Sequence, residues 1–183
     1  HWAVTGRCNL SCRHCFMCSP QGKYGQTERA DMLRVLSMLE DANVACVSLT
    51  GGEPLLYPHL RELIARLSEK GIAVNEIVTN GVLLSEGLLR FLQDHGQKPM
   101  FQISLDGVGE HDRMRGAEGA EQGALRAIER SVHHGFFTAV TSVFSRENLH
   151  TLGACYEQMK RLRVSAWLIG RAQTTGLWKG GPM

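Results

Sequence analysis

Four of the six cysteines lie within eleven residues near the start of the chain, at Cys8, Cys12, Cys15 and Cys18. Clustered thiolates are soft ligands that favour zinc, copper(I) and iron–sulfur clusters. A disulfide framework is typical of small secreted chains that lack a core, but this chain has 183 residues, of which 43% are hydrophobic. A closed zinc site normally takes its ligands from two separated pairs, so the spacing Cys-x3-Cys-x2-Cys favours another kind of metal site.

The spacing of Cys8, Cys12 and Cys15, on a loop that leaves a predicted strand, resembles the radical S-adenosylmethionine (radical SAM) superfamily. The resemblance implies that these three thiolates hold a [4Fe-4S] cluster by three irons and leave the fourth iron to S-adenosylmethionine. An open coordination position distinguishes a metal site that meets its substrate from a closed, four-ligand site. Cys18 lies beyond the family pattern, so we expect it not to be a ligand.

Gly51-Gly52-Glu53 follows a predicted strand and resembles the Gly-Gly-Glu signature of the same family. The resemblance implies that these residues bind the methionyl amino group of S-adenosylmethionine. An ammonium group needs carbonyl and carboxylate acceptors, and glycine lets the backbone come close. An ordinary strand-to-helix turn is the alternative. His14 stands where the family usually places an aromatic residue against adenine, so we expect it in the cofactor site as well.

Further matches follow the fourth predicted strand. Ser104 and Asp106 resemble the Ser-x-Asp of the peptide-modifying branch, which implies contacts with the ribose or carboxylate of S-adenosylmethionine. Arg115 belongs to a run that resembles the family's His-Asp-x-x-Arg-Gly, which implies a charge-assisted clamp on the carboxylate of the nucleoside. A solvated loop arginine is the alternative, and Arg126 competes for the same role.

Two other strand ends carry weaker signals. Asn80 turns the chain after the third predicted strand, where it either lines the cofactor or substrate pocket or belongs to a simple turn. Gly170 begins a Gly-Arg-Ala segment that resembles the one after the sixth strand of many relatives, whose backbone contacts adenine. Cys46 and Cys155 stand alone on predicted apolar faces, where buried and inert cysteine is the usual finding.

Apolar periodicity predicts six strands that alternate with five helices. The predicted strands span residues 2–5, 44–50, 72–78, 100–105, 138–144 and 164–169, and the helices span 28–42, 58–70, 85–96, 122–134 and 146–162. Thr27 is the expected N-cap of the first helix. Residues 106–119 are expected to form a long polar loop. The last helix is expected to bury Leu149, Leu152, Tyr156 and Met159.

Such alternation implies parallel strands joined by right-handed crossovers, which both an open doubly wound sheet and a barrel satisfy. The family resemblance implies an α/β partial TIM-like (β/α)6 barrel with its helices outside. Nearly all the segments named above follow C-terminal ends of strands, which lie on one face in such folds, so we expect a single pocket. We interpret residues 1–183 as one core domain of a longer chain whose N-terminal flank and C-terminal extension are missing, because the sequence opens at His1 and ends without a closing element.

Composition narrows the functional classes. The 20 basic and 18 acidic residues give a net charge of +2, and no basic run indicates nucleic-acid binding. No apolar run approaches the roughly 18 residues needed to span a membrane, and no charged-then-apolar leader opens the sequence. Six cysteines without such a leader favour a reducing compartment. We expect a cytoplasmic protein that binds neither nucleic acid nor membrane.

The resemblance implies an enzyme in which a reduced [4Fe-4S] cluster cleaves S-adenosylmethionine to a 5'-deoxyadenosyl radical that abstracts hydrogen from a substrate. The motifs after the fourth strand look most like SPASM-type members, many of which modify peptides or proteins. A peptide or protein substrate and an electron donor such as flavodoxin or ferredoxin are therefore expected. A step in heme or cofactor biosynthesis is the alternative within the family. The alternative outside it is a non-catalytic zinc or iron–sulfur module that uses all four clustered cysteines.

Overall fold

The computed structural model describes residues 1–19, 23–173 and 176–178. Within them, six strands form one sheet in chain order, and every neighbouring pair is parallel. The strands are β1 (Trp2–Thr5), β2 (Cys46–Gly51), β3 (Ala73–Thr79), β4 (Met100–Ser104), β5 (Thr138–Phe144) and β6 (Ala166–Arg171). Parallel neighbours need long crossover connections, and helices supply them here.

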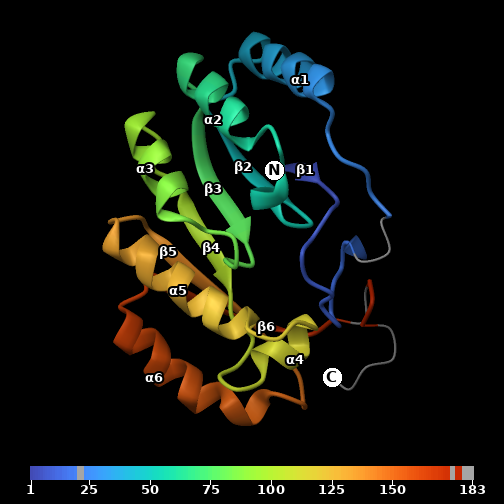
Figure 1. Ribbon diagram of the computed structural model, residues 1–183, viewed down its shortest axis with the longest axis vertical. Helices are drawn as coiled ribbons and strands as arrows, with labels where there is room; N and C mark the ends of the chain where they lie inside the picture. The colour runs from blue at the N-terminus through green and yellow to red at the C-terminus, as the bar shows by residue number, and fades with distance from the viewer. Residues whose placement is uncertain (20–22, 174–175, 179–183) are drawn as a thin grey trace.

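The helices are α1 (Arg29–Asp41), α2 (Leu60–Glu69), α3 (Glu86–Asp94), α4 (His111–Arg115), α5 (Ala120–His133) and α6 (Leu152–Leu162). Two short 3₁₀ turns, η2 (Pro54–Leu56) and η3 (Leu149–Thr151), precede α2 and α6. In Figure 1 the long helices lie around the outside of the curved sheet, and the loop that follows β1 runs down the opposite side of the view. The predicted α/β fold with parallel strands and outer helices is confirmed.

The two faces of the sheet differ in polarity because side chains alternate along each strand. One face is apolar, fully buried and packed against the helices, and we call it the helix-covered face. Its strand residues include Leu49, Ile77, Phe101 and Val140. The other face, which we call the open face, is only partly covered and lines a cavity. Its strand residues include Thr50, Gln102, Ser104 and Thr141. The core of the protein therefore lies between the sheet and its helices.

The predicted loop over residues 106–119 is wrong, because it contains α4 and the turn that leads into α5. The Asp112 carboxylate accepts hydrogen bonds from the backbone N–H groups of Gly119 and Glu121, each at 2.7 Å. These bonds fix the turn between the two helices. With five residues, α4 is shorter than the windows in which apolar periodicity is measurable.

The prediction for the last helix is also wrong at its start and in its orientation. The helix α6 begins at Leu152, and three of the four residues expected inside are exposed, namely Leu149, Leu152 and Tyr156. The Asn148 side chain accepts a hydrogen bond from the Ser145 N–H at 2.7 Å, and this turn delays the helix. The residues that α6 buries are Cys155, Met159 and Leu162.

Smaller differences concern single positions. Glu28, and not Thr27, precedes α1, and its side chain makes no capping hydrogen bond. Cys46 is exposed because it is the first residue of β2, whereas Cys155 is buried as predicted. Gly170 lies inside β6 and not after it. No helix in the described ranges has both the length and the apolar character needed to cross a bilayer.

Candidate functional site

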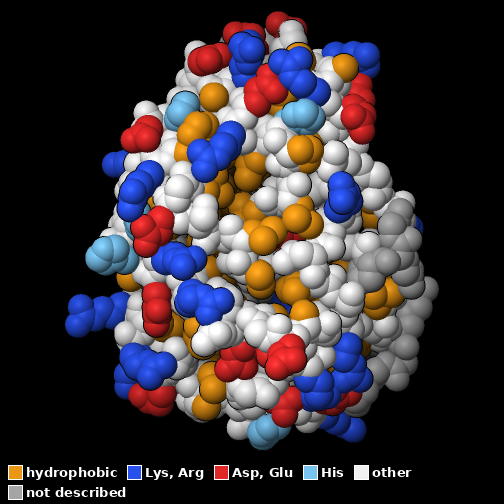
Figure 2. All heavy atoms as spheres, in the orientation of Figure 1, with side chains coloured by type: hydrophobic (Ala, Val, Ile, Leu, Met, Phe, Trp, Pro, Cys, Tyr) orange, Lys and Arg blue, Asp and Glu red, His pale blue; other side chains and the backbone are white. Residues whose placement is uncertain are grey.

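A cavity of about 420 Å³ lies at the C-terminal ends of the strands. The ends of β2, β3, β4 and β5 line it together with α4 and the loop that carries the clustered cysteines. Its lining includes Cys8, Cys12, His14, Cys15, Gly51, Gly52, Asn80, Gln102, Ser104, Arg115 and Thr141. Figure 2 shows a hollow with apolar and uncharged side chains near the middle of the viewed face, while charged side chains gather around it. Segments far apart in the sequence thus meet at one site, as parallel strands require.

Nine of the twelve predicted site residues line this cavity. They are the three cysteines of the motif together with His14, Gly51, Gly52, Asn80, Ser104 and Arg115. The side chains of Glu53 and Asp106 are fully buried behind the lining, and Gly170 in β6 is not part of it. Arg126 is exposed on α5 and does not line the cavity, whereas Arg115 does. Of the two arginines, Arg115 is therefore the one placed to bind a ligand there.

The loop that carries the cysteines is held by the end of α4. The N–H of Ser11 donates to the Arg115 carbonyl at 3.1 Å, and the N–H of Arg13 donates to the Met114 carbonyl at 3.0 Å. Gly116 follows with φ of 65°, and a Cβ at this position would lie 2.6 Å from the Ser11 carbonyl oxygen. Only glycine permits this approach, so the His-Asp-x-x-Arg-Gly run shapes the cysteine loop directly.

Burial makes the thiols of Cys8 and Cys12 less acidic than free cysteine. Burial raises the pKa of Cys8 to about 11, and burial also raises the pKa of Cys12, against the opposing effect of Arg115. Without a metal these thiols stay protonated at neutral pH, and a bound metal displaces the protons. Cys18 does not line the cavity and has a positive φ of 51°. The residue types and their shared cavity fit a cluster with three thiolate ligands.

The cysteine loop and the end of β2 come unusually close. The N–H of Gly52 donates to the Thr5 carbonyl at 2.7 Å, and the N–H of Glu53 donates to the Arg7 carbonyl at 2.8 Å. A Cβ on Gly51 or Gly52 would lie 2.3 Å from a carbonyl oxygen of this segment. Both glycines are therefore required by backbone contact, in addition to any contact with a ligand.

Glu53 is fully buried and binds the neighbouring strand end. Its carboxylate accepts hydrogen bonds from the Leu55 N–H (3.0 Å), the Thr79 hydroxyl (2.7 Å) and the Asn80 N–H (2.8 Å). Burial raises the pKa of Glu53, and these donors oppose the shift. The Asn80 side chain in turn donates to the Asn9 side chain at 2.9 Å. Glu53 thus connects β2, β3 and the cysteine loop.

Asp106 and Arg115 form a buried ion pair at the end of β4. The Arg115 Nε lies 2.7 Å from Asp106 Oδ2, and the His14 Nε2 lies 3.3 Å from the same oxygen. Burial opposes ionisation of Asp106, but the positive charge of Arg115 brings its pKa below the ordinary value. Arg115 Nη1 also donates to Cys12 Sγ at 3.6 Å. The guanidinium expected to bind a ligand carboxylate is already engaged with two groups of the protein.

Several polar atoms near the cavity have no partner in the described residues. They include His14 Nδ1 and Thr141 Oγ1, both enclosed and both in side chains that line the cavity. Buried polar atoms are almost always hydrogen-bonded, so such atoms indicate a polar ligand or ordered water. In the described ranges, no three His, Cys, Asp or Glu side chains are arranged to hold a single metal ion. In a [4Fe-4S] cluster each of three thiolates binds a different iron.

The sequence did not single out several residues that build this site. Thr79 binds Glu53, and Gln102 and Thr141 line the cavity from the open face. For Gln102 the available signal was a polar residue two positions before Ser104 in an otherwise apolar strand, whereas the alternate positions Ala139 and Val143 gave no such signal for Thr141. The bond between Thr79 and Glu53 had no such signal, because it joins residues 26 positions apart.

Comparisons with known proteins agree with this geometry. The chain is 29% identical over 166 residues to the antilisterial bacteriocin subtilosin biosynthesis protein AlbA of Bacillus subtilis (strain 168), covering 90% of this chain and 37% of AlbA. It is 28% identical over 178 residues to an AdoMet-dependent heme synthase of Nitratidesulfovibrio vulgaris, covering 96% of this chain and 48% of that protein. The chain therefore spans less than half the length of these two relatives.

The fold also matches solved structures. SuiB of Streptococcus suis bound to the precursor peptide SuiA superposes with a TM-score of 0.76 at 18% identity, over 94% of this chain and 38% of SuiB. The enzyme anSMEcpe with bound AdoMet and a peptide gives a TM-score of 0.79 at 19% identity, over 93% of this chain and 49% of the other. These likenesses confirm the partial barrel. Residues 2–159 match the family model of the Radical SAM superfamily, and the chain belongs to that superfamily.

Proposed function

We propose that this protein is a radical SAM enzyme that acts on a peptide or protein. The observation that carries the proposal is the convergence of Cys8, Cys12 and Cys15 with the ends of four strands around one cavity. A reduced [4Fe-4S] cluster held there would supply the one electron that breaks a carbon–sulfur bond of S-adenosylmethionine, which gives methionine and the 5'-deoxyadenosyl radical that abstracts hydrogen. The protein's own task is to hold, orient and enclose these groups.

The proposed roles of the residues follow from their positions. The thiolates of Cys8, Cys12 and Cys15 hold the cluster, and Cys18 does not. Ser104, Asn80 and His14 line the cavity and offer polar contacts to S-adenosylmethionine, together with the backbone of Gly51 and Gly52. Glu53 and Asp106 act from behind the lining by fixing strand ends, although the resemblance implies direct contact. For Gly170 the role at adenine stays a prediction.

A peptide substrate is favoured over a tetrapyrrole by the charges in the cavity. A tetrapyrrole carries carboxylate side chains that need cationic partners. Among the described residues that line the cavity, the only Lys or Arg is Arg115, and it already pairs with Asp106. The names of AlbA and of the SuiB complex refer to a bacteriocin and a precursor peptide, whereas another relative is a heme synthase. We place the protein in the cytoplasm with flavodoxin or ferredoxin as its electron donor.

Anaerobic reconstitution with iron and sulfide tests the proposal. With dithionite and S-adenosylmethionine, we expect the protein to release 5'-deoxyadenosine, measured by liquid chromatography. Cys8→Ala, Cys12→Ala and Cys15→Ala abolish the release, because each removes a cluster ligand, whereas Cys18→Ala keeps it. A protein that retains zinc after this treatment and forms no 5'-deoxyadenosine contradicts the proposal. Loss of release in Cys18→Ala contradicts the assignment of three ligands.

A further inference from the structure

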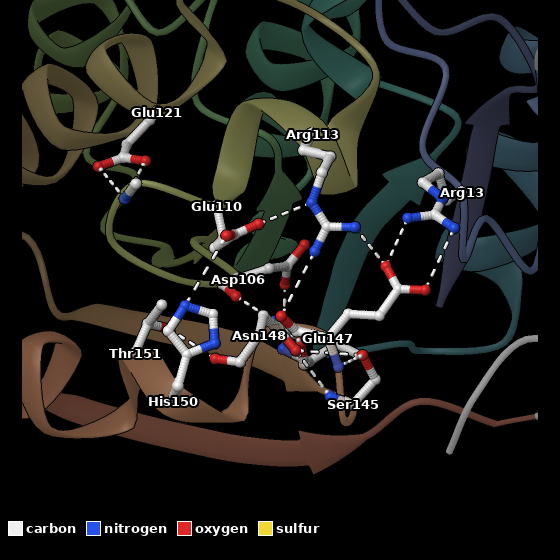
Figure 3. Close-up of polar contacts among 12 residues, drawn as sticks. Arg13, Asp106, Glu110, Arg113, Glu121, Ser145, Glu147, Asn148, His150 and Thr151 are labelled. Atoms are coloured by element: carbon white, nitrogen blue, oxygen red, sulfur yellow. Dashed lines mark hydrogen bonds and ion pairs between the residues drawn. The ribbon is translucent and has the colours of Figure 1, made fainter.

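Glu147, in the turn between β5 and α6, lies between two arginines from distant parts of the chain (Figure 3). Its carboxylate oxygens accept from Arg13 Nη1 at 2.5 Å and from Arg13 Nη2 at 3.3 Å. The same carboxylate accepts from Arg113 Nη1, and Arg113 Nη2 donates to the Glu147 backbone carbonyl at 3.4 Å. One acidic residue thus joins the cysteine loop to α4 and to the end of β5.

The two arginines stand at positions that matter for the proposed cluster ligands. Arg13 lies between Cys12 and His14 in the cysteine loop, and its guanidinium also stacks over the Trp178 ring at 5.4 Å. Arg113 belongs to α4, whose last residues receive the backbone hydrogen bonds of the loop. The loop is therefore joined to α4 in two ways, by backbone hydrogen bonds and by the side-chain bridge through Glu147.

Glu147 itself is held in place by its own turn. Its N–H donates to the Ser145 hydroxyl at 3.2 Å, and the Ser145 N–H donates to the Asn148 side chain at 2.7 Å. The Asn148 amide donates to the Val143 carbonyl at 2.9 Å and also to the Asp106 carbonyl. These bonds tie the turn to β5 and to the end of β4. Glu147 is thus a fixed point against which the loop is positioned.

We propose that Glu147 is a positioning residue that holds the cysteine loop over its cluster and slows loss of the cluster. The inference rests on the proposed function, in which the loop cysteines are the ligands. A single exposed ion pair contributes little. Here, however, one carboxylate pairs with two guanidiniums. In the described residues, its removal leaves Arg13 without an acidic partner and leaves Arg113 with Glu110 alone. Loss of the bridge removes the attraction that holds the loop against α4, so the loop opens faster.

The test measures iron release from the anaerobically reconstituted protein under excess ferrous chelator, followed by absorbance. We expect Glu147→Ala to release iron roughly three- to tenfold faster than the unaltered protein, because two exposed ion pairs are lost together. Arg13→Gln should accelerate release by a similar factor. The double variant should be no faster than the more affected single variant, since both remove the same bridge. Thermal unfolding of each metal-free variant is measured in parallel.

The Arg29–Glu62 pair supplies the matched control. It is also a two-bond pair, with N–O distances of 2.5 and 2.9 Å, but it joins α1 to α2 away from the cavity. Glu62→Ala should leave the release rate unchanged. Equal release from Glu147→Ala and the unaltered protein, or equal acceleration in Glu62→Ala, overturns the inference. If Glu147→Ala unfolds too readily to be loaded, Glu147→Gln takes its place under the same criteria. An unaltered protein that binds no cluster contradicts the proposed function instead.

Discussion

The two faces of the sheet have different tasks, although each strand contributes to both. On the helix-covered face, Leu49, Ile77 and Phe101 are fully buried among apolar side chains. On the open face, the neighbouring residues Thr50 and Gln102 are only partly buried and line the cavity. Burial of apolar area stabilises the fold on the first face. The second face contributes less to folding and is therefore free to carry ligand contacts.

This division explains why the partial barrel keeps its shape without filling its interior. In a closed eight-stranded barrel, inward side chains pack in layers and form part of the core. In this six-stranded sheet the inward residues near the strand ends include the polar Gln102 and Ser104 beside Val78 and Val143, and they line the cavity. Stability and ligand binding should therefore respond to different substitutions in the same strand.

The largest expected loss of stability is that of Phe101→Ala, which we compare with a substitution of its neighbour in β4. Phe101→Ala should lower the free energy of unfolding by about 3–5 kcal/mol, because it leaves a cavity in a fully packed core. Gln102→Ala, one residue on and facing the cavity, should change it by less than about 1 kcal/mol. Urea denaturation of the metal-free protein measures both. Similar losses in the two variants contradict the division between the faces.

The next largest effect on stability is expected at the buried ion pair of Asp106 and Arg115, beside the cavity at the end of β4. Asp106→Asn should lower the free energy of unfolding at pH 7 by about 3 kcal/mol, because it leaves Arg115 buried without a counter-charge. The folded-state pKa of Asp106 lies below its ordinary value. The stabilisation is therefore fully present above pH of about 4, near the unfolded-state pKa, and is lost as pH falls through the folded-state pKa.

Denaturation of the metal-free protein from pH 7 down to pH 3 measures this dependence. The difference between the unaltered protein and Asp106→Asn should narrow below pH of about 4, as the carboxylate takes up its proton. A difference that stays constant across this range contradicts the ion pair as its source. Replacing both partners together by apolar residues of similar size should cost less than Asp106→Asn alone.

Features set by local pattern were predictable from the sequence. The apolar strands and amphipathic helices that form the helix-covered face follow directly from periodicity. Cys8, Cys12 and Cys15 carry their own spacing, and Gly51 and Gly52 follow a predicted strand, as parallel α/β sites require. Each of these signals lies within a few residues, so no knowledge of the folded chain was needed to find it.

Features that depend on contacts between distant residues were not predictable. The role of Arg115 as a ligand clamp stays a prediction, and only the folded chain shows that its charge also pairs with Asp106. Glu147 carried no signal, because its partners lie 134 and 34 residues away. The prediction for the start of α6 was wrong because the Asn148 amide donates to the carbonyls of Val143 in β5 and of Asp106 after β4, which holds this segment in a turn. In each case the partner of the side chain could not be predicted from the spacing of residues in the sequence.

The central claim is that the cysteine loop holds a cluster with one iron left open for S-adenosylmethionine. The most direct measurement is the electron paramagnetic resonance spectrum of the reduced, reconstituted protein before and after addition of S-adenosylmethionine. We predict a signal of a reduced [4Fe-4S] cluster whose g values shift on addition, in the unaltered protein and in Cys18→Ala alike. A spectrum that is identical with and without S-adenosylmethionine, or a protein that forms no such cluster, contradicts the account.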